Sequence, residues 1–541
     1  MLLIKQLKNT KILLLFTLYF IAHVFLLMNF NGVYWDDWVV VYQKPETIIN
    51  IFTQNGFIWI GYLHVFLQKL GNGIHVYRIF SFFAYFFSGV FIFYILQRIK
   101  YFDKSAAFFI SLLFLLSPVN DARVALINTP PILNLFFFYF SFFLLSVYLD
   151  GKKKLYTRLF TLTLFFISFS LESLLVFYST VLFYIFYNIQ QKNQEKGFRL
   201  LILNFLIHYI DFICLPVLFF VLKNSFFEPH GLYANYNSLN SDPITLMALL
   251  IKSFDTALYQ PIYHAFSTAW SNLGIILVVS IIVIYLMQKI HIPLTKDVLM
   301  NLKWNIKIHK RTFHIPGSLM MLTIGVILFL LAVFPYCVVG KLPQADNWAA
   351  RNQILVPLGM SFIIYYLISF TVKIHNRIPN MLLYGVISIF IVQGLHSYYL
   401  YYIDWFYQSS LLEQFKHSKT IQEHTTFIVK DNLEADIWVN KRGFSFYEAN
   451  GLARRAFNDD SRLIVHDISS IESFKQYKQY PQYNFSHWVN HTPVFLEFSK
   501  NKNYQLTWNK QFWLFFYNAF NQDAFEKNVK DLIEITKPTP T

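Results

Sequence analysis

Long apolar segments alternate with short polar loops along most of this chain. A helix needs about 20 apolar residues to cross the hydrocarbon core of a bilayer. Eleven segments follow this pattern, although several are short: residues 11–30, 76–96, 104–118, 131–149, 158–171, 172–189, 199–222, 272–288, 317–336, 353–372 and 379–402. The pattern predicts an all-α polytopic membrane protein with about 11 transmembrane helices. No small-x-small cleavage site follows the first segment, so we expect it to remain as a helix.

The basic residues between the segments predict which side of the membrane each loop faces. They precede the first segment and then recur in every second loop: Lys5, Lys8 and Lys11; Arg98, Lys100 and Lys104; Lys152, Lys153, Lys154 and Arg158; Lys192, Lys196 and Arg199; residues 289–311; Lys373 and Arg377. Basic loops mark the cytoplasmic side of a membrane protein. The N-terminus is then cytoplasmic, and an odd number of crossings puts the C-terminal region on the extracytoplasmic side.

Composition supports this class and limits the partners. Hydrophobic residues make up 55% of the chain and charged residues 14%, which excludes an ordinary soluble protein. The formal net charge is +15, but residues 403–541 hold 16 basic and 16 acidic residues. The whole excess therefore lies in residues 1–402, where the basic loops explain it, and nucleic acid is not an expected partner. Only two cysteines occur, so we expect no disulfide framework in the outer regions.

Three of the predicted outer loops are long or rich in polar groups. The first extracytoplasmic loop, residues 31–75, contains apolar stretches too short to cross a bilayer, which predicts helices lying along the interface. The loop at 223–271 carries glycine, asparagine and proline residues and is predicted to form a mobile lid. The loop at 337–352 is short and polar and contains Arg351.

The composition changes to that of a water-soluble region near residue 403. Three short strand candidates occur at 427–429, 463–465 and 494–498, and a helical pattern covers 522–535. The sequence therefore predicts two domains, a transmembrane domain at 1–402 and a small extracytoplasmic α/β domain at 403–541.

Two adjacent carboxylates, Asp36 and Asp37, follow the first segment within the sequence Tyr34-Trp35-Asp36-Asp37-Trp38. The topology places them at the outer boundary of the membrane, where aromatic rings are common. Two neighbouring carboxylates repel each other, which raises the pKa of one of them. Such a pair suits proton transfer, a metal ion or a sugar hydroxyl. The alternative is that the pair caps an interfacial helix, because aspartate is a good N-cap.

Four motifs follow one another at the outer ends of the first six segments. They are Asp36-Asp37, the stretch Leu70-Gly71-Asn72-Gly73-Ile74-His75-Val76-Tyr77-Arg78, Leu115-Leu116-Ser117-Pro118, and Ser170-Leu171-Glu172-Ser173. Their order over roughly residues 10–200 resembles the GT-C superfamily of integral-membrane glycosyltransferases, which includes protein O-mannosyltransferases and aminoarabinose transferases. The later segments resemble that family in layout alone.

The resemblance implies a fold and an activity. We expect a GT-C-like enzyme of the bacterial cytoplasmic membrane that works on the extracytoplasmic face. It would transfer a sugar from a polyprenyl-phosphate-linked donor to a glycan, lipid or protein acceptor. The donor's lipid tail stays in the bilayer, so the reacting groups must lie at the depth of the membrane surface.

The same resemblance assigns roles to the charged residues at the outer ends of the segments. A carboxylate takes the proton of the acceptor hydroxyl, and we expect Asp36 in that role, with Asp37 beside it as a partner in catalysis. The leaving phosphate needs cations, and Arg78, Arg351 and Arg123 are the candidates. The alternative is that these arginines reach the lipid headgroups, as boundary arginines commonly do.

Three further positions carry ionisable groups at or near the membrane. Glu172 lies where two apolar segments meet, where an ionisable group is costly unless it is paired or functional, and we expect it to contact substrate. His64 is a candidate ligand for the acceptor or a metal, although a packed histidine is the alternative. Asp211 lies inside the seventh segment, and its spacing from His208 predicts a structural pair.

Other functions remain open. A polysaccharide polymerase or ligase of the O-antigen type also uses lipid-linked donors and outer arginines. A non-enzymatic transporter or flippase would predict broken helices and charges near the middle of the membrane, whereas the charges here lie at the segment ends. The sequence requires no cofactor; a divalent metal held by Asp36 and Asp37 is an open alternative.

One C-terminal pattern stands out without an assigned chemistry. It runs Phe446-Tyr447-Glu448-Ala449-Asn450-Gly451-Leu452 and is followed by Phe457-Asn458-Asp459. It resembles a pattern of bacterial membrane proteins.

Overall fold

The computed structural model describes residues 10–537 except 72, 152–153, 194–196, 240–241, 291–302, 309–310, 346, 374–377, 434–437, 440–441, 460 and 468–491. Some residues of the predicted basic loops and motifs lie outside the described ones: Lys5, Lys8, Asn72, Lys152, Lys153, Lys196, Arg377 and most of the segment 289–311.

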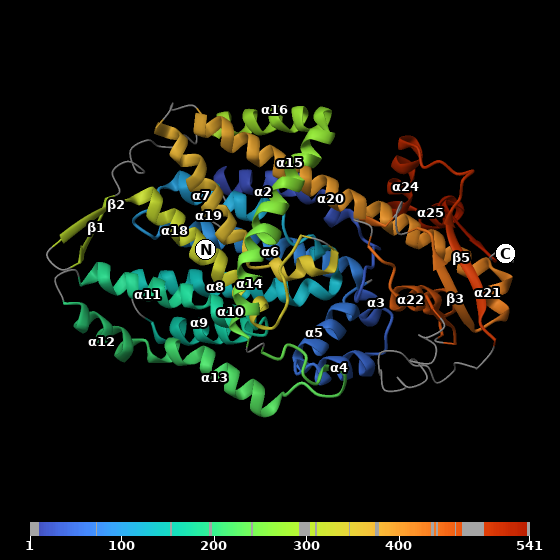
Figure 1. Cartoon of the computed structure of the whole chain (residues 1–541), viewed down its shortest axis with the longest axis horizontal. Coiled ribbons are helices and arrows are strands. Elements are labelled where there is room, and N and C mark those ends of the chain that lie inside the picture. The colour runs from blue at the N-terminus through green and yellow to red at the C-terminus, as the bar shows by residue number, and fades with distance from the viewer. Residues whose placement is uncertain are drawn as a thin grey trace.

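Helices make up the described chain as far as residue 290 (Figure 1). They follow in this order: α2 (Thr10–Met28), α3 (Asp37–Val40), α4 (Pro45–Gln54), α5 (Ile58–Lys69), α6 (Ile74–Gln97), α7 (Lys104–Leu116), η1 (Asp121–Val124), η2 (Leu126–Asn128), α8 (Thr129–Asp150), α9 (Leu155–Ser168), α10 (Ser173–Phe177), α11 (Ser179–Lys192), α12 (Phe198–His208), α13 (Ile210–Phe226), η3 (Gly231–Tyr233), α14 (Pro243–Phe254), η4 (Asp255–Tyr259), α15 (Gln260–Ser271) and α16 (Leu273–Ile290).

A hairpin and four more helical segments lead to α20, the longest of the described helices. The hairpin consists of β1 (Lys303–Ile308) and β2 (Arg311–Pro316), and it is followed by α18 (Gly317–Val338), η5 (Asn347–Gln353), α19 (Val356–Ser369), η6 (Phe370–Lys373) and α20 (Ile378–His417). The C-terminal region then contains α21 (Lys419–Glu423), β3 (Thr426–Asp431), α22 (Phe446–Phe457), β4 (Leu463–Val465), β5 (Val494–Lys500), α24 (Trp508–Phe520), α25 (Gln522–Val529), η9 (Lys530–Leu532) and β6 (Ile533–Thr536).

The apolar helices confirm a helical membrane protein, but they do not show eleven crossings. Among the described residues, six helices are long and apolar enough to cross a membrane, and two bent pairs raise the number to eight if each pair is one span. Helices α7, α9 and α19 coincide with three predicted segments but have only 13, 14 and 14 residues. At 1.5 Å per residue such helices reach about 20 Å, which is short of a hydrocarbon core of about 30 Å.

The basic residues Lys11, Lys104 and Arg98 lie together at one end of the bundle, called here the basic-loop end. Lys11 Nζ donates to Lys104 O at 3.4 Å, and Arg98 pairs with Asp150 at 2.8 Å. The β1–β2 hairpin and the C-terminal sheet lie at opposite ends of the molecule (Figure 1). The alternation of loop charge along the sequence is therefore matched by a separation in space.

The predicted outer loops lie together at the other end, called here the Asp36 end. The first loop is joined to two others, because Gln54 O accepts from His230 N at 2.8 Å and Trp59 Nε1 donates to Ser170 Oγ at 2.8 Å. Asn120 N, in the loop before α8, donates to Gln353 Oε1 at 3.1 Å. The predicted lid thus packs on α4 through His230, while its mobility stays a prediction.

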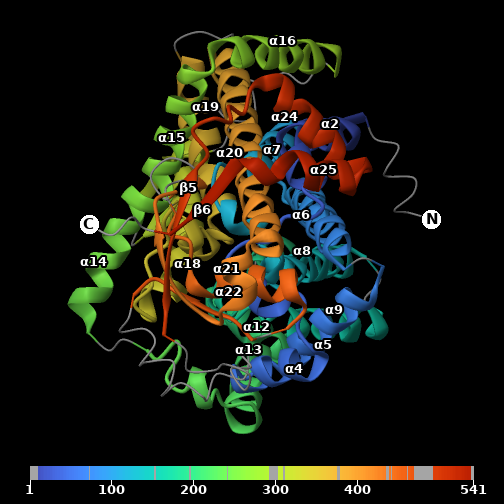
Figure 2. The same ribbon diagram turned by 90° about the vertical axis from the view of Figure 1, so that its right-hand side faces the viewer.

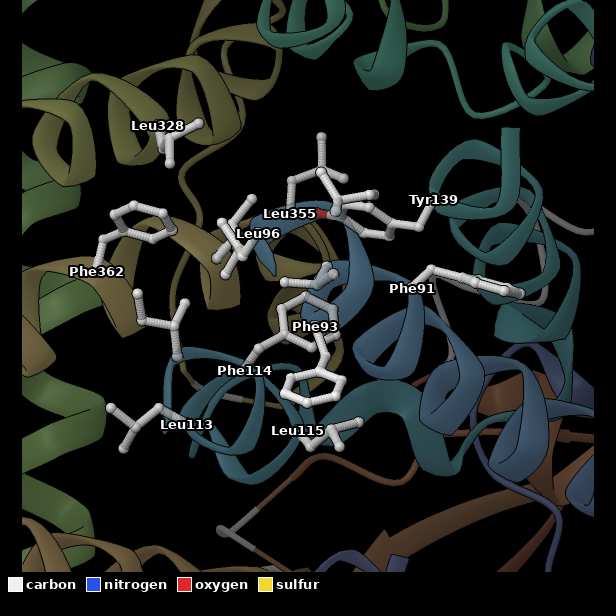
Figure 3. Packing of buried hydrophobic residues seen from close by; sticks show 14 of the residues in the cluster. Phe91, Phe93, Leu96, Leu113, Phe114, Leu115, Tyr139, Leu328, Leu355 and Phe362 are labelled. Carbon is white, nitrogen blue, oxygen red and sulfur yellow. The ribbon is translucent and has the colours of Figure 1, made fainter. Parts of the chain in front are cut away.

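Residues of α6, α7, α8, α18 and α19 pack in the apolar core of the bundle (Figure 3). Aromatic rings of α6 and α8 pack face to face, as Phe91 and Phe143 do with centroids 5.5 Å apart. Helices α18 and α19 approach closely because α19 has a glycine at the contact: a Cβ on Gly359 would lie 2.5 Å from Phe329 N. This core holds the helix ends in place and thereby fixes the loops at both ends.

The C-terminal region is continuous with the bundle through α20. This helix has 40 residues, so the predicted boundary between 402 and 403 falls inside it. The sheet order is β4-β3-β5-β6, with β3 parallel to both β4 and β5, and β6 antiparallel to β5. The three predicted strands are therefore present.

The predicted helix 522–535 ends early. Helix α25 stops at Val529, and Ile533–Thr536 forms strand β6. In the sequence Ile-Glu-Ile-Thr apolar and polar residues alternate, so both isoleucines can point to the same face of a strand. Ile535 pairs with Phe498 of β5. Pairing at the free edge of the sheet thus overrides the helical pattern at the end of this segment.

Candidate functional site

Asp36 lies at the Asp36 end of the bundle, directly before α3. Its carboxylate is 34% exposed, and its Oδ2 atom is 3.6 Å from Arg351 Nη1. The guanidinium of Arg351 lies over the ring of Trp348, 4.2 Å from the ring centroid. The hydroxyl of Tyr447, on α22, donates a hydrogen bond to the same carboxylate. Three segments that are far apart in the sequence therefore meet at one accessible carboxylate.

The surroundings make Asp36 a better proton acceptor than an aspartate in water. Burial raises the pKa of Asp36, while the charge of Arg351 and the hydrogen bond from Tyr447 oppose that rise. Burial, together with the negative charge of Asp36, raises the pKa of Tyr233 to about 12. Tyr233 belongs to η3 of the predicted lid, so this loop faces the carboxylate. A half-buried carboxylate with a raised pKa suits general-base catalysis.

Asp37 is fully buried and faces away from Asp36's partners. Its Oδ2 accepts from Tyr34 N at 3.1 Å, and its Oδ1 accepts from Ile127 N at 2.8 Å. Burial raises the pKa of Asp37 to about 7, although these backbone N–H groups favour the ionised form. The placement differs from the expectation of a second catalytic carboxylate, because Asp37 is used to hold η2 against the first loop.

The two aspartates direct their carboxylates to different partners. Asp37 accepts from two backbone N–H groups, whereas Asp36 faces Arg351. Within the described residues, no group of three or more His, Cys, Asp or Glu side chains is placed to hold a metal ion. A divalent metal at Asp36 and Asp37 stays a prediction.

Trp35 forms a strained backbone turn directly before Asp36. Its φ angle is 48°, in the left-handed region that a bulky side chain rarely adopts, at a cost of roughly 1–3 kcal/mol. Its N–H donates to Glu448 Oε1 at 3.1 Å, and its ring lies 5.4 Å from that of Trp348. The C-terminal region therefore holds the peptide group between Tyr34 and Trp35, at the start of a strained turn.

A buried ion network anchors α22 beside the first loop. Arg442 Nε is 2.9 Å from Asp404 Oδ2 of α20, and Arg442 Nη1 is 2.7 Å from Glu448 Oε1, with all three side chains buried. Glu448 also caps α22 by accepting from Ser445 N at 2.9 Å. These contacts join α20, α22 and the Trp35 peptide into one hydrogen-bonded unit.

The close approach of α22 to α3 also depends on a glycine. A Cβ on Gly451 would lie 2.6 Å from the indole ring of Trp38. Trp38 Nε1 in turn donates to Gln408 Oε1 of α20 at 3.3 Å. Helix α22, which carries Tyr447, is therefore pressed directly onto the segment that carries Asp36.

Arg78 is buried and held by backbone carbonyls. Its Nε donates to Asn29 O at 3.1 Å, its Nη2 donates to Gly32 O at 2.8 Å, and its Nη1 donates to Val124 O. These bonds satisfy carbonyls that would otherwise be buried without a partner. Arg78 thus ties α6 to the first loop and η1, and it does not lie open to a substrate phosphate as the sequence predicted.

Arg123 is also buried, and it points into the bundle. Its Nη2 donates to Tyr398 Oη at 2.9 Å and to His23 Nε2 at 2.7 Å, and its guanidinium lies 4.0 Å from the ring centroid of Tyr85. A cation this deep is stabilised by hydroxyl groups and ring faces. Arg123 therefore links α2, α6 and α20. This buried position does not match the predicted contact with a phosphate.

Glu172 is paired away from Asp36. Its Oε1 is 2.9 Å from Lys223 Nζ at the end of α13, and Lys223 lies over the ring of Phe57. The neighbouring Ser173 Oγ is 3.2 Å from Tyr336 Oη, on which Arg351 acts electrostatically. Glu172 therefore belongs to the Asp36 end, but through a separate ion pair.

His64 is packed, which matches the alternative for this residue. Its Nδ1 is 2.8 Å from Tyr77 Oη, and its ring stacks on Phe52 with centroids 4.9 Å apart. Burial lowers the pKa of His64 to about 3, so the ring is neutral at ordinary pH. This placement does not offer His64 to an acceptor or a metal.

Asp211 has a different partner from the one predicted. It forms two hydrogen bonds with Arg158, at 2.6 Å to Nε and 2.5 Å to Nη2, and Arg158 also donates to His208 O. The planar guanidinium fits a carboxylate at two points, which a histidine one turn away cannot do. The pair is structural, as expected, but it joins α9 to α13.

Sequence reasoning missed most of the residues around Asp36. Tyr447, Glu448 and Arg442 come from a region about 400 residues away, and Tyr233 and Trp348 come from other loops. The available signal was the C-terminal pattern with its adjacent tyrosine and glutamate, for which no chemistry was assigned. A comparison with protein-family models and one with curated proteins each find no match to this chain.

Proposed function

We propose that this chain is a membrane glycosyltransferase of the GT-C type that uses Asp36 as its general base. The observation that carries the proposal is the meeting of Asp36 and Arg351 at a partly exposed position, 3.6 Å apart. A carboxylate that can take a proton and a cation that can receive a phosphate are the two groups that sugar transfer from a phosphate donor requires. Tyr447 and Tyr233 add hydrogen-bonding hydroxyls beside them.

The reaction would run in one displacement. The acceptor hydroxyl oxygen forms a bond to the anomeric carbon of the donor sugar, while its proton passes to the Asp36 carboxylate. The bond between the anomeric carbon and the phosphate oxygen breaks, and its electron pair leaves with the polyprenyl phosphate. Arg351 would stabilise the charge that develops on that phosphate by turning from Asp36 toward it. Tyr447 is a positioning residue that orients Asp36 through its hydrogen bond.

The buried groups near Asp36 would hold the surrounding segments in place and would not take part in the reaction. Asp37 and Arg78 fix the first loop against η1 and η2, and Glu448 fixes the Trp35 peptide. None of them needs to touch substrate for Asp36 to act. The proposed active site is therefore one accessible carboxylate in a rigid frame, and the paired carboxylates expected from the sequence are not required.

The proposal includes a location and an orientation. The basic-loop end would face the cytoplasm of a bacterial cell, and the Asp36 end would face outward with the C-terminal region. Lipid-linked donors displayed at the outer surface would then reach Asp36 and Arg351. The acceptor would be a glycan, a lipid or a protein, with the lid carrying Tyr233 closing over it.

The test compares two aspartates that are similarly exposed but lie at opposite ends of the bundle. Asp36→Asn should lower sugar transfer in membrane vesicles by about 10²–10⁴-fold and let the lipid-linked donor accumulate, because a general base contributes that much. Asp150→Asn, which removes the partner of Arg98, is the matched control and should leave transfer unchanged. Full transfer by the Asp36→Asn variant would reject the proposal.

Two other functions have distinguishable outcomes. A polymerase or ligase would use the same donor chemistry but extend or attach a long glycan, which the size of the labelled product reveals. A transporter is favoured by one observation, the bends of 57° and 105° in the two broken helix pairs. It would move its substrate across vesicles without breaking a glycosidic bond, and Asp36→Asn would not cause a lipid-linked sugar to accumulate.

A further inference from the structure

Helix α24 of the C-terminal region has two faces of different character. One face packs inward through Leu514 and Asn518, which are buried. The opposite face carries five aromatic side chains that are between 45% and 77% exposed: Trp508, Phe512, Trp513, Phe516 and Phe520. These residues are spaced so that they form one arc along the helix. Soluble surfaces rarely expose so much contiguous aromatic area, so this face needs a partner.

Contacts on its inner face place α24 at the level where α2 ends. The ring of Phe515 lies 5.7 Å from that of Phe25, near the end of α2. Asn31 Nδ2, just beyond α2, donates to Asn518 O at 3.4 Å. Figure 2 shows α24 beside α2 and α20, on the flank of the molecule. The helix therefore lies where the first apolar helix leaves the bundle.

Helix α24 also contacts α20, at the same level as its contacts with the end of α2. Trp508 stacks on Tyr399 with centroids 6.2 Å apart, and Asn518 Nδ2 donates to Tyr402 Oη at 2.9 Å. Both tyrosines belong to the part of α20 where its apolar run gives way to charged residues. Tyrosine and tryptophan gather at this depth in membrane proteins because their rings are amphipathic.

Two helices of the bundle at the Asp36 end also expose large apolar side chains. On α6, which begins at the Asp36 end, Ile79, Phe80 and Phe83 are exposed. On α5, predicted to lie along the interface, Tyr62 and Phe66 are exposed in the same way. The lysine that flanks the arc of α24 is Lys510, whose Nζ lies 3.9 Å from the Tyr504 ring centroid. Aromatic residues with flanking lysines are typical of helices that lie in the headgroup layer.

We propose that α24 is an interfacial membrane helix, whose aromatic face inserts into the outer leaflet beside α2 and α20. The bilayer is the partner of this surface, and the C-terminal region is held against the membrane by two attachments, α20 and α24. This anchoring is independent of any chemistry at Asp36. It would keep α22 at a fixed depth relative to the lipid.

The test uses the whole chain in lipid vesicles with a nitroxide label. The two natural cysteines, Cys214 and Cys337, are replaced by serine, and single cysteines are introduced as Phe512→Cys and, as the matched control, Lys430→Cys. Position 430 is an exposed strand residue of the same region. The label at 512 should collide with oxygen more often, and with a water-soluble nickel chelate several-fold less often, than the label at 430.

Other occupants of the surface give different results. Equal access of the chelate to both labels would overturn the proposal, since the face would then lie in water. Dipolar broadening between labels at 512 would also overturn it, because a second copy of the chain would cover the face. A label at Phe516→Cys repeats the measurement one turn further along and guards against a local disturbance by the first substitution.

Discussion

The two ends of the helical bundle each carry a partly exposed ion pair, but the described buried ion network lies at the Asp36 end. At the basic-loop end, Arg98 and Asp150 form a pair that stays partly exposed. At the Asp36 end, Arg442 lies between Asp404 and Glu448 with all three side chains buried. Removing an ion from water costs several kcal/mol, so a buried network needs a reason that an exposed pair does not.

The difference indicates that the buried network at the Asp36 end holds the groups around Asp36 in fixed positions. The network holds α22, α22 supplies Tyr447 to Asp36, and Glu448 holds the strained Trp35 peptide. The basic-loop end has no comparable described unit among its ion pairs, and its charges are explained by membrane orientation. A carboxylate that must meet a substrate in one geometry gains from such a frame.

The largest expected effect comes from breaking the buried network. Arg442→Met should lower the free energy of unfolding by about 3–5 kcal/mol, because it leaves Asp404 and Glu448 buried without their cation. Equilibrium unfolding in mixed micelles would measure this. A loss below about 1 kcal/mol would mean that the network is no more important than a surface pair.

A second prediction concerns the cation beside Asp36. Arg351→Gln should reduce transfer by about 10²–10³-fold, as expected when a group that stabilises transition-state charge is removed. Stability should change little, because Arg351 is partly exposed. Transfer kinetics and thermal unfolding of the same preparation would check both parts. Equal losses in stability and transfer would assign Arg351 a structural role.

The pH dependence of transfer tests the contact between Asp36 in the first loop and Tyr447 in the C-terminal region. Asp36 must be ionised to accept a proton, so the rate should fall as the pH drops through its pKa. The hydrogen bond from Tyr447 lowers the pKa of Asp36, and Tyr447→Phe should therefore raise that pKa. The acid limb of kcat/KM should move to higher pH. An unmoved limb together with a lower rate would show that Tyr447 acts elsewhere.

The smallest effect is expected at the basic-loop end. Arg98→Gln removes one partner of an exposed pair and should cost less than about 1 kcal/mol of stability. Transfer should be unaffected. Unfolding measured beside Arg442→Met makes the comparison direct, and similar losses for the two variants would remove the contrast between the ends.

Much of the fold could be predicted from the pattern of apolar residues. Each of the eleven predicted segments coincides with a helix, because long apolar runs have few alternatives in a membrane. The number of crossings could not be predicted, since α7, α9 and α19 are too short to be assigned by length. Strand β6 was missed because pairing with β5, which is not local, decides its conformation.

The site was predictable only in part. Asp36 and Arg351 are the expected residues that the structure brings together, because both lie at outer segment ends. The burial of Arg78 depends on carbonyls of Asn29, Gly32 and Val124, and no sequence pattern shows where those carbonyls point. Likewise, adjacent aspartates look equivalent in a sequence, but the structure gives Asp36 and Asp37 different partners.

The central claim is that Asp36 and Asp37 have different tasks, and one paired measurement tests it. Asp36→Asn and Asp37→Asn are purified together, and each is measured for sugar transfer and for the free energy of unfolding. Asp36→Asn should lose transfer and keep its stability. Asp37→Asn should lose about 1–3 kcal/mol of stability, because its amide group would face the backbone N–H of Tyr34 or Ile127. Folded Asp37→Asn protein should retain transfer, and the reverse assignment would contradict the account.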